Sequence, residues 1–156
     1  MAYIAPLLNN KSPAIIDKWG IELKPMKYVR IINHTNQGPP PILAKFCQSF
    51  FCQLRGLMFT KSIPEDQGLL LVQNSDSRLN ASIHMMFMWI DLAIIWINSD
   101  YLVVDRVLAR QWKLIYSPKS AAKYVLETGV SHLAEFNIGD KVRFVNMTSD
   151  EHEQIN

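Results

Sequence analysis

The sequence has no apolar run long enough to cross a bilayer, and it has little net charge. Its most apolar stretch, Ile83 to Ile97, is fifteen residues long and is interrupted by His84 and Asp91, whereas a transmembrane helix needs about 20 apolar residues. The opening MAYIAPLLNNKSP has neither the basic lead nor the hydrophobic segment of a secretory signal. A formal charge of +2 does not by itself indicate a polyanionic partner. We therefore expect a cytoplasmic protein without a membrane span.

Cysteine is scarce. The sequence has two cysteines, Cys47 and Cys52, whose spacing matches neither a disulfide framework nor a metal-binding knuckle. We expect two reduced thiols on or near a helix, which fits a reducing compartment. No base or motif near Cys52 indicates an activated thiol nucleophile.

Catalytic fingerprints are also missing. The sequence contains no Gly-x-Ser-x-Gly turn, no P-loop, no dinucleotide-binding motif and no internal repeat. A length of 156 residues, with 49% apolar and 19% charged residues, is typical of one folded domain. These features leave an enzymatic activity uncertain and favour a protein that is not an enzyme.

What the sequence does contain is a series of short β-rich segments separated by turns. The segments predicted as strands are residues 28–33, 69–73, 83–89, 92–98, 101–110, 124–127 and 141–145. Short helices are predicted over residues 48–54 and 131–137, the second with His132 and Glu135 on its outer side. The pattern predicts an α+β fold, a small and mostly antiparallel β-barrel of six to seven short strands with two short helices.

The prolines and the polar ends set the expected domain boundaries. Residues 1–27 carry three prolines and no sustained periodicity, which predicts an N-terminal arm. Residues 148–156 are polar and are expected to form a flexible tail. The single β-barrel-like domain is therefore predicted to span residues 28–147.

Four short motifs follow one another between Tyr28 and Phe144. They are Leu54-Arg55-Gly56-Leu57-Met58, Gly68-Leu69-Leu70-Leu71, Ser82-Ile83-His84 with Phe87-Met88, and Leu126-Glu127 followed by Gly139-Asp140-Lys141-Val142. In content and order this set resembles the motifs of a bacterial and archaeal family, the domain of unknown function family 192. The resemblance implies a small β-barrel with two helices and no established activity.

The sequence departs from that family pattern at polar positions. After the third motif the family has a proline and then an aspartate, and here these positions hold Asp91 and Ala93. Thr60 stands where the family often has an arginine, and residues 126–131 read LETGVS in place of the family's LELPAG. If the family has a polar site, this chain has lost or moved part of it.

His84 is the most suggestive polar residue of the apolar stretch. On a strand it would share one face with Met86 and Met88, and an imidazole with two thioethers is a soft set that suits Cu(I). Methionine is also an ordinary core residue, so a buried, hydrogen-bonded histidine is the favoured interpretation. We expect no metal and no cofactor.

The acidic candidates also have structural interpretations. Asp91 could act as an acid or base with a raised pKa, but a tight connection in which it accepts backbone N–H groups is favoured. Glu127 and Asp140 lie near the ends of predicted elements and could pair with an arginine, namely Arg55, Arg78 or Arg143.

The function predicted from these observations is that of a non-catalytic β-barrel module that binds a small polar ligand or a peptide. The predicted ligand-binding residues are His84, Arg55 and Glu127, which are expected to share a concavity, together with Asp91 and Asp140.

Two alternatives stay open. The first is a hydrolase-type enzyme that uses His84 and Asp91 for proton transfer, which requires both side chains in one pocket. The second is single-stranded nucleic-acid binding by a region with basic and aromatic residues, namely Lys113, Tyr116, Lys119 and Lys123. A solvated charged face explains those residues equally well, so nucleic acid is not the expected partner.

Overall fold

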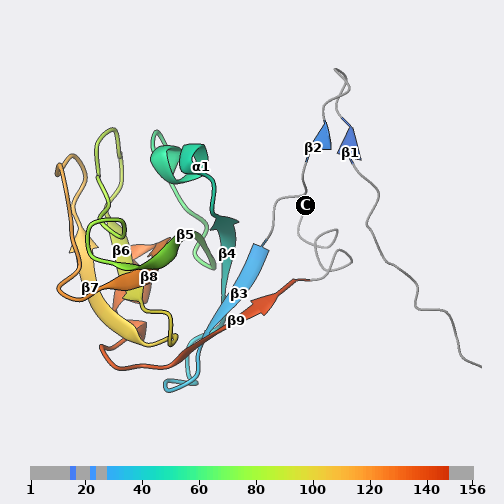
Figure 1. The fold of residues 1–156 in the computed structure, drawn as a ribbon, viewed down its shortest axis with the longest axis vertical. Coiled ribbons are helices and arrows are strands. Elements are labelled where there is room, and N and C mark those ends of the chain that lie inside the picture. The colour runs from blue at the N-terminus through green and yellow to red at the C-terminus, as the bar shows by residue number, and fades with distance from the viewer. Residues whose placement is uncertain (1–14, 17–21, 24–27, 148–156) are drawn as a thin grey trace, which may run out of the picture. The chain divides into compact units, whose positions relative to one another are not determined.

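The computed structural model describes residues 15–16, 22–23 and 28–147 (Figure 1). Strands β1 (Ile15–Ile16) and β2 (Glu22–Leu23) pair with each other in an antiparallel two-stranded sheet. Residues 28–147 lie in one compact unit, which contains all the other elements. The remainder of the predicted arm and the predicted tail at 148–156 lie outside the described residues.

A seven-stranded sheet forms the centre of the compact unit. Its strands are β3 (Tyr28–Asn33), β4 (Ile42–Cys47), β5 (Gln67–Ser77), β6 (Leu92–Ile97), β7 (Val103–Ala109), β8 (Ala122–Thr128) and β9 (Val142–Asn146). They lie in the order β7-β6-β8-β5-β4-β3-β9. Only β4 and β5 are parallel, and helix α1 (Phe50–Arg55) lies in the connection between them, as parallel neighbours require a crossover.

The predicted α+β class is confirmed, but the predicted closed barrel is wrong. Barrel closure requires the two edge strands to pair along their length. Here β7 and β9 are not hydrogen-bonded neighbours, and the segments before them meet at one isolated bridge, between Leu102 and Lys141. The sheet is therefore mixed and open.

Both faces of the sheet are covered by apolar side chains. One cluster takes buried residues from all seven strands and packs against Phe136, which follows the 3-10 helix η1 (Val130–Glu135). The other cluster joins β5, β6 and β8 to the segment after α1 and to the loop before β6. Strand β6 is buried at every position, as expected for a strand with a covered face on each side.

The segment 83–89 is the main departure from the predicted strands. It is a loop that makes one isolated bridge, between Ile83 and Tyr116. Phe87 has a φ of 60°, which lies outside the β region, so the chain turns there instead of continuing as a strand. Ile83, Met85 and Met88 are buried against the sheet, and this explains why the segment is so apolar.

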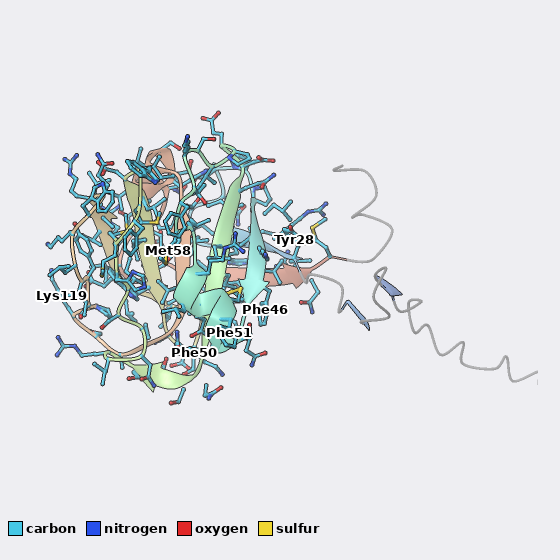
Figure 2. The ribbon with its side chains drawn as sticks, turned by 90° about the horizontal axis from the view of Figure 1, so that it is seen from above. Tyr28, Phe46, Phe50, Phe51, Met58 and Lys119 are labelled. Atoms are coloured by element: carbon cyan, nitrogen blue, oxygen red, sulfur yellow. A yellow bond between two sulfur atoms is a disulfide. The ribbon has the colours of Figure 1, made fainter. Side chains whose placement is uncertain are left out.

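The segment 42–57 combines a strand and a helix. Residues 42–47 form β4, which was not predicted because its apolar residues recur at a helical spacing. The helix predicted over 48–54 is confirmed as α1. Ser49 caps α1 by accepting the Cys52 N–H at 3.3 Å. Helix α1 has no buried residue, and Phe50 and Phe51, marked beside it in Figure 2, are 71% and 81% exposed.

The two cysteines are joined in a disulfide, which corrects the prediction of reduced thiols. Cys47 ends β4 and Cys52 lies in the first turns of α1. The strand-to-helix junction brings their Cα atoms to 5.7 Å, a normal disulfide separation. The expectation of a reducing compartment therefore loses its basis.

No helix within residues 28–147 has the length and apolar character that a membrane span requires.

Candidate functional site

A cavity of about 70 Å³ lies beneath the end of α1. Its walls come from α1 and the turn after it, from β5, from the loop before β6 and from β8. Its polar lining residues are Gln53, Arg55, Gln73, Asn80, Ser82, His84 and Glu127. The structure thus brings together three of the five residues predicted from the sequence, namely Arg55, His84 and Glu127.

Glu127 is a buried acidic residue that lines this cavity. It lies on the central strand β8, between Leu69 of β5 and Ile94 of β6, and it is 6% exposed. Burial in this apolar face raises the pKa of the Glu127 carboxyl to about 7. Within residues 28–147 no hydrogen-bond donor meets this carboxyl group. Glu127 is therefore a buried acid whose pKa is raised toward neutrality, and it faces the cavity without a partner among the described residues.

Gly56 lets the chain turn over that carboxyl group. Its N–H donates to the Cys52 carbonyl at 2.8 Å and so ends α1. Its φ of 46° favours glycine, and a Cβ at this position would lie 3.5 Å from Oε2 of Glu127. The turn after α1 therefore forms the wall of the cavity nearest to Glu127.

His84 supplies a second polar group without a partner. Its Nδ1 is buried, and no described residue forms a hydrogen bond with it, so the hydrogen bond expected for a buried histidine is missing at this nitrogen. The backbone on each side is fixed, because Ile83 exchanges hydrogen bonds of 2.9 Å with Tyr116 and the Met85 N–H donates to Lys113 at 3.0 Å. The imidazole is thus held at the cavity by its neighbours while one nitrogen is left unsatisfied.

The His84, Met86 and Met88 set considered for Cu(I) does not form. Because residues 83–89 are not a strand, these side chains do not share one face; Met86 is 40% exposed and Met88 is buried. Among the described residues, no group of three or more His, Cys, Asp and Glu side chains is placed to hold a metal ion.

Arg55 brings a positive charge to the cavity. It is the last residue of α1 and is exposed. The disulfide between Cys47 and Cys52 ties its helix to β4. A guanidinium at this position offers up to five donors to a ligand acceptor.

Asp91 does not line the cavity. Its carboxylate accepts the backbone N–H of Gln111 and the Arg110 guanidinium, each at 2.9 Å. The hydrogen bond from Gln111 and then that from Arg110 lower the pKa of Asp91 against the opposing effect of desolvation. The raised pKa considered for Asp91 is therefore wrong. The predicted acceptance of a backbone N–H is confirmed, although not in a connection between two strands.

Asp140 is also outside the cavity. It accepts the Asn33 side-chain amide at 2.7 Å and the Asn137 N–H at 2.8 Å. Asn33 in turn accepts the N–H groups of Thr35 and Asn36 at 3.0 Å. Asp140 and Asn33 thus fix the turns that precede β4 and β9.

The sequence predicted His132 on the outer side of its helix. In the structure His132 is buried. Its Nδ1 lies 2.6 Å from Glu135 Oε2 and its Nε2 contacts the Glu65 carbonyl. Burial opposes the charged imidazolium, but these two contacts outweigh it and raise the pKa of His132. Spacing on an ideal helix misled the prediction because η1 is a 3-10 helix.

The basic residues considered for nucleic acid have local contacts. Lys113 Nζ lies 4.2 Å from the ring centre of Tyr116, and Lys123 Nζ lies 5.6 Å from that of Tyr124. The Lys119 N–H donates to Asp105 at 2.8 Å. Nucleic-acid binding by these residues stays a prediction.

Comparison with known proteins gives consistent sequence matches. The family model for DUF192, described as Uncharacterized ACR, matches residues 31–144. A UPF0127 protein of Thermococcus kodakarensis is 38% identical over 114 residues, covering 72% of this chain and 71% of the relative. A UPF0127 protein of Pyrococcus furiosus is 31% identical over 119 residues, covering 75% of this chain and 99% of the relative.

Two solved structures share the fold. A candidate transcription regulator from Sinorhizobium meliloti superposes with a TM-score of 0.66 at 18% identity, over 76% of this chain and 92% of that one. A protein of unknown function from Novosphingobium aromaticivorans gives 0.63 at 19% identity, over 91% and 99%. At these identities the two likenesses establish the fold alone.

Proposed function

We propose that this chain, which belongs to the DUF192 family of proteins of unknown function, is a non-catalytic protein that binds a small polar ligand in the cavity of Arg55, His84 and Glu127. The observation that carries the proposal is the pair of unpartnered polar groups in one cavity. These are the fully buried Nδ1 of His84 and the carboxyl group of Glu127, a residue that is 6% exposed; neither has a hydrogen-bond partner among residues 28–147.

Both groups lack a hydrogen bond among the described residues. A buried polar group without a hydrogen bond costs about 1–3 kcal/mol. A ligand that bonds to both His84 and Glu127 recovers that energy on binding, so the cavity is prepared for a polar molecule and not for an apolar one.

The three side chains define the ligand chemistry. Near pH 7 Glu127 is present in both protonation states, so it donates to or accepts from a ligand hydroxyl. The Arg55 guanidinium suits an anionic group. A space of about 70 Å³ holds only a few water molecules. The ligand that fits best is a small anion carrying a hydroxyl group, or the end of a larger molecule with that chemistry.

The structure changes which residues a hydrolase could use. Asp91 is held by Arg110 and Gln111 outside the cavity, so the pair of His84 and Asp91 has no support. A proton-transfer role would instead pair His84 with Glu127, whose pKa of about 7 suits general acid–base chemistry. Turnover on a hydrolase panel that is lost in both His84→Ala and Glu127→Gln would establish this second candidate.

The test of binding is an NMR titration of the ¹⁵N-labelled full chain. Glycolate is the probe, and acetate and glycerol test the anionic group and the hydroxyl group separately. We expect glycolate to shift the amides of Gly56, His84 and Glu127, more strongly than acetate or glycerol does. We expect Glu127→Gln to bind glycolate more weakly than the wild type does. Asp91→Asn is expected to bind it as the wild type does, because the Asp91 carboxylate lies outside the cavity. Shifts confined to other regions, or equal shifts in both variants, would refute the proposal.

A further inference from the structure

Four aromatic side chains lie together on the surface of the molecule. Phe59, Phe87, Trp89 and Trp112 are 62%, 41%, 54% and 49% exposed. Their ring centres are 5.6 Å apart for Phe59 and Phe87, 6.0 Å for Phe87 and Trp112, and 5.3 Å for Trp89 and Trp112. We call these four residues the aromatic patch. Each ring contacts another member, so the patch is continuous.

The patch is assembled by three loops that are distant in the sequence. They are the turn after α1, the loop before β6 and the loop after β7, which lie toward one end of the sheet in Figure 1. Backbone hydrogen bonds of 3.0 Å join them, from the Phe59 N–H to the Phe87 carbonyl and from the Trp112 N–H to the Met85 carbonyl. The rings are therefore placed by specific tertiary contacts.

Three members of the patch have a left-handed backbone. The φ values are 63° for Phe59, 60° for Phe87 and 63° for Trp112. This conformation is unfavourable for bulky side chains, and such outliers gather at ligand-binding surfaces. The fold thus keeps three large, partly exposed rings on residues whose backbone conformation is unfavourable for them.

The surroundings of the patch are aliphatic and basic. Met86, Leu114 and Ile115 are 40%, 71% and 58% exposed and belong to two of the same loops. Residues 56–62, 84–91 and 109–116 contain the cations Lys61, Arg110 and Lys113 and a single carboxylate, Asp91. The contact segments are therefore net positive, even with Asp91 paired to Arg110 at 2.9 Å.

We propose that the aromatic patch docks on the surface of an anionic lipid bilayer. Indole and phenyl rings favour the boundary between head groups and acyl chains, and exposed aliphatic side chains add buried apolar area there. The cations beside the rings complement the negative surface of such a bilayer. This inference does not depend on the cavity of Arg55, His84 and Glu127 being a ligand site.

Nucleic acid and protein partners fit the same residues less well. Base stacking needs free ring faces, whereas Trp112 packs edge-to-face with both Phe87 and Trp89. The neighbouring Leu114 and Ile115 offer no face for stacking. A bilayer accepts aliphatic and aromatic groups alike, and its phosphates account for the basic flank, whereas lysine is depleted at protein interfaces.

The test is co-sedimentation of the full chain with vesicles of phosphatidylcholine, alone or with phosphatidylglycerol added. The diagnostic variant is Phe59→Asn with Trp112→Asn. Asparagine tolerates the left-handed conformation, so this variant removes two rings and is expected to keep the fold. Ile138→Asn is the matched control, since Ile138 is 61% exposed in the turn before β9.

We expect the wild type and Ile138→Asn to partition onto the anionic vesicles, and the double variant to partition about tenfold more weakly. Lys113→Gln is expected to lower partitioning about fivefold on anionic vesicles only. Failure of the wild type to sediment with the anionic vesicles, or unchanged partitioning of the double variant, overturns the proposal. Equal wild-type partitioning onto both vesicle types overturns its electrostatic part.

Two further measurements separate the other occupants. Sedimentation velocity reports self-association, and fluorescence anisotropy with an oligothymidylate reports nucleic-acid binding. Either signal, present in the wild type and lost in the double variant without any vesicle binding, assigns the patch to that other partner and overturns the lipid proposal.

Discussion

The replacement Glu127→Gln tests the buried acid directly. Glutamine has nearly the same shape as glutamate but does not ionise in the tested range, so the change removes one titration and leaves the packing of β8 in place. Because burial raises the pKa of Glu127 from 4.5 to about 7, the folded chain keeps a proton that the unfolded chain has already released between these two pH values. Folding is therefore favoured below pH 4.5 and becomes less favourable as the pH rises through about 7.

The magnitude follows from the size of the shift. Each pKa unit corresponds to about 1.4 kcal/mol, so this group alone removes about 3 kcal/mol of wild-type stability between acid and neutral pH. Glu127→Gln does not have this loss. The free energy of unfolding of the variant minus that of the wild type is therefore expected to rise by about 3 kcal/mol from about pH 4 to about pH 8 and then to level off.

The assay is urea unfolding of both chains, followed by circular dichroism at pH steps across that range. Taking the difference cancels every other titrating group, including His132. A difference that is constant with pH would contradict the raised pKa, because it would mean that the carboxyl group of Glu127 ionises alike in the folded and unfolded chains.

Three other outcomes follow from the structure. For His132, burial opposes protonation but its hydrogen bonds outweigh it and raise the pKa. The stability that it adds is thus complete below pH 6.5 and is lost as the pH rises through the raised value, and the advantage of the wild type over His132→Gln in urea should shrink accordingly. Gly68→Ala places a Cβ 2.8 Å from the Glu127 carbonyl oxygen, which should cost about 1–3 kcal/mol in the same assay; no loss would contradict the close approach of β5 and β8. Reduction of the disulfide between Cys47 and Cys52 should cost about 2 kcal/mol for so short a loop, whereas the double serine variant should be insensitive to reductant.

The sequence-based predictions succeeded where strand character is local. Residues 28–33, 92–97 and 142–146 are β-rich segments bounded by turn residues, and each is a strand in the structure. Residues 42–47 were missed because their apolar side chains continue into α1 at a helical spacing. Residues 83–89 alternate like a strand because Ile83 and Met85 are buried by the sheet beneath them, which is a tertiary effect that no local pattern contains.

Closure of the sheet and pairing of the cysteines were beyond local inference for the same reason. A barrel depends on whether β7 meets β9, and residues 103–109 and 142–146 carry no signal for that long-range pairing. The disulfide depends on the angle at which β4 enters α1, which brings Cys47 and Cys52 together.

Three of the five candidate site residues lie where the sequence-based prediction placed them, and two do not. The family motifs pointed to Arg55, His84 and Glu127, and the structure places all three around one cavity. The same motif argument selected Asp140, which fixes a turn elsewhere. Motif membership identifies a residue as part of the family pattern, but only the fold decides whether its side chain faces a cavity or stabilises a turn.

The cavity and the aromatic patch share two loops, and both contain groups that oppose stability. The turn after α1 supplies Gly56 over the buried Glu127 and then the left-handed Phe59, and the loop before β6 supplies His84 to the cavity and Phe87 to the aromatic patch. Left-handed bulky residues cost about 1–2 kcal/mol each, and an unpaired buried acid adds to that cost. Local choices that conflict with the fold are expected at functional positions. Phe59, Phe87 and the unpaired nitrogen of His84 lie in these two loops, which the hydrogen bond between Phe59 and Phe87 joins. This is the strongest physical reason to look for function at this end of the molecule.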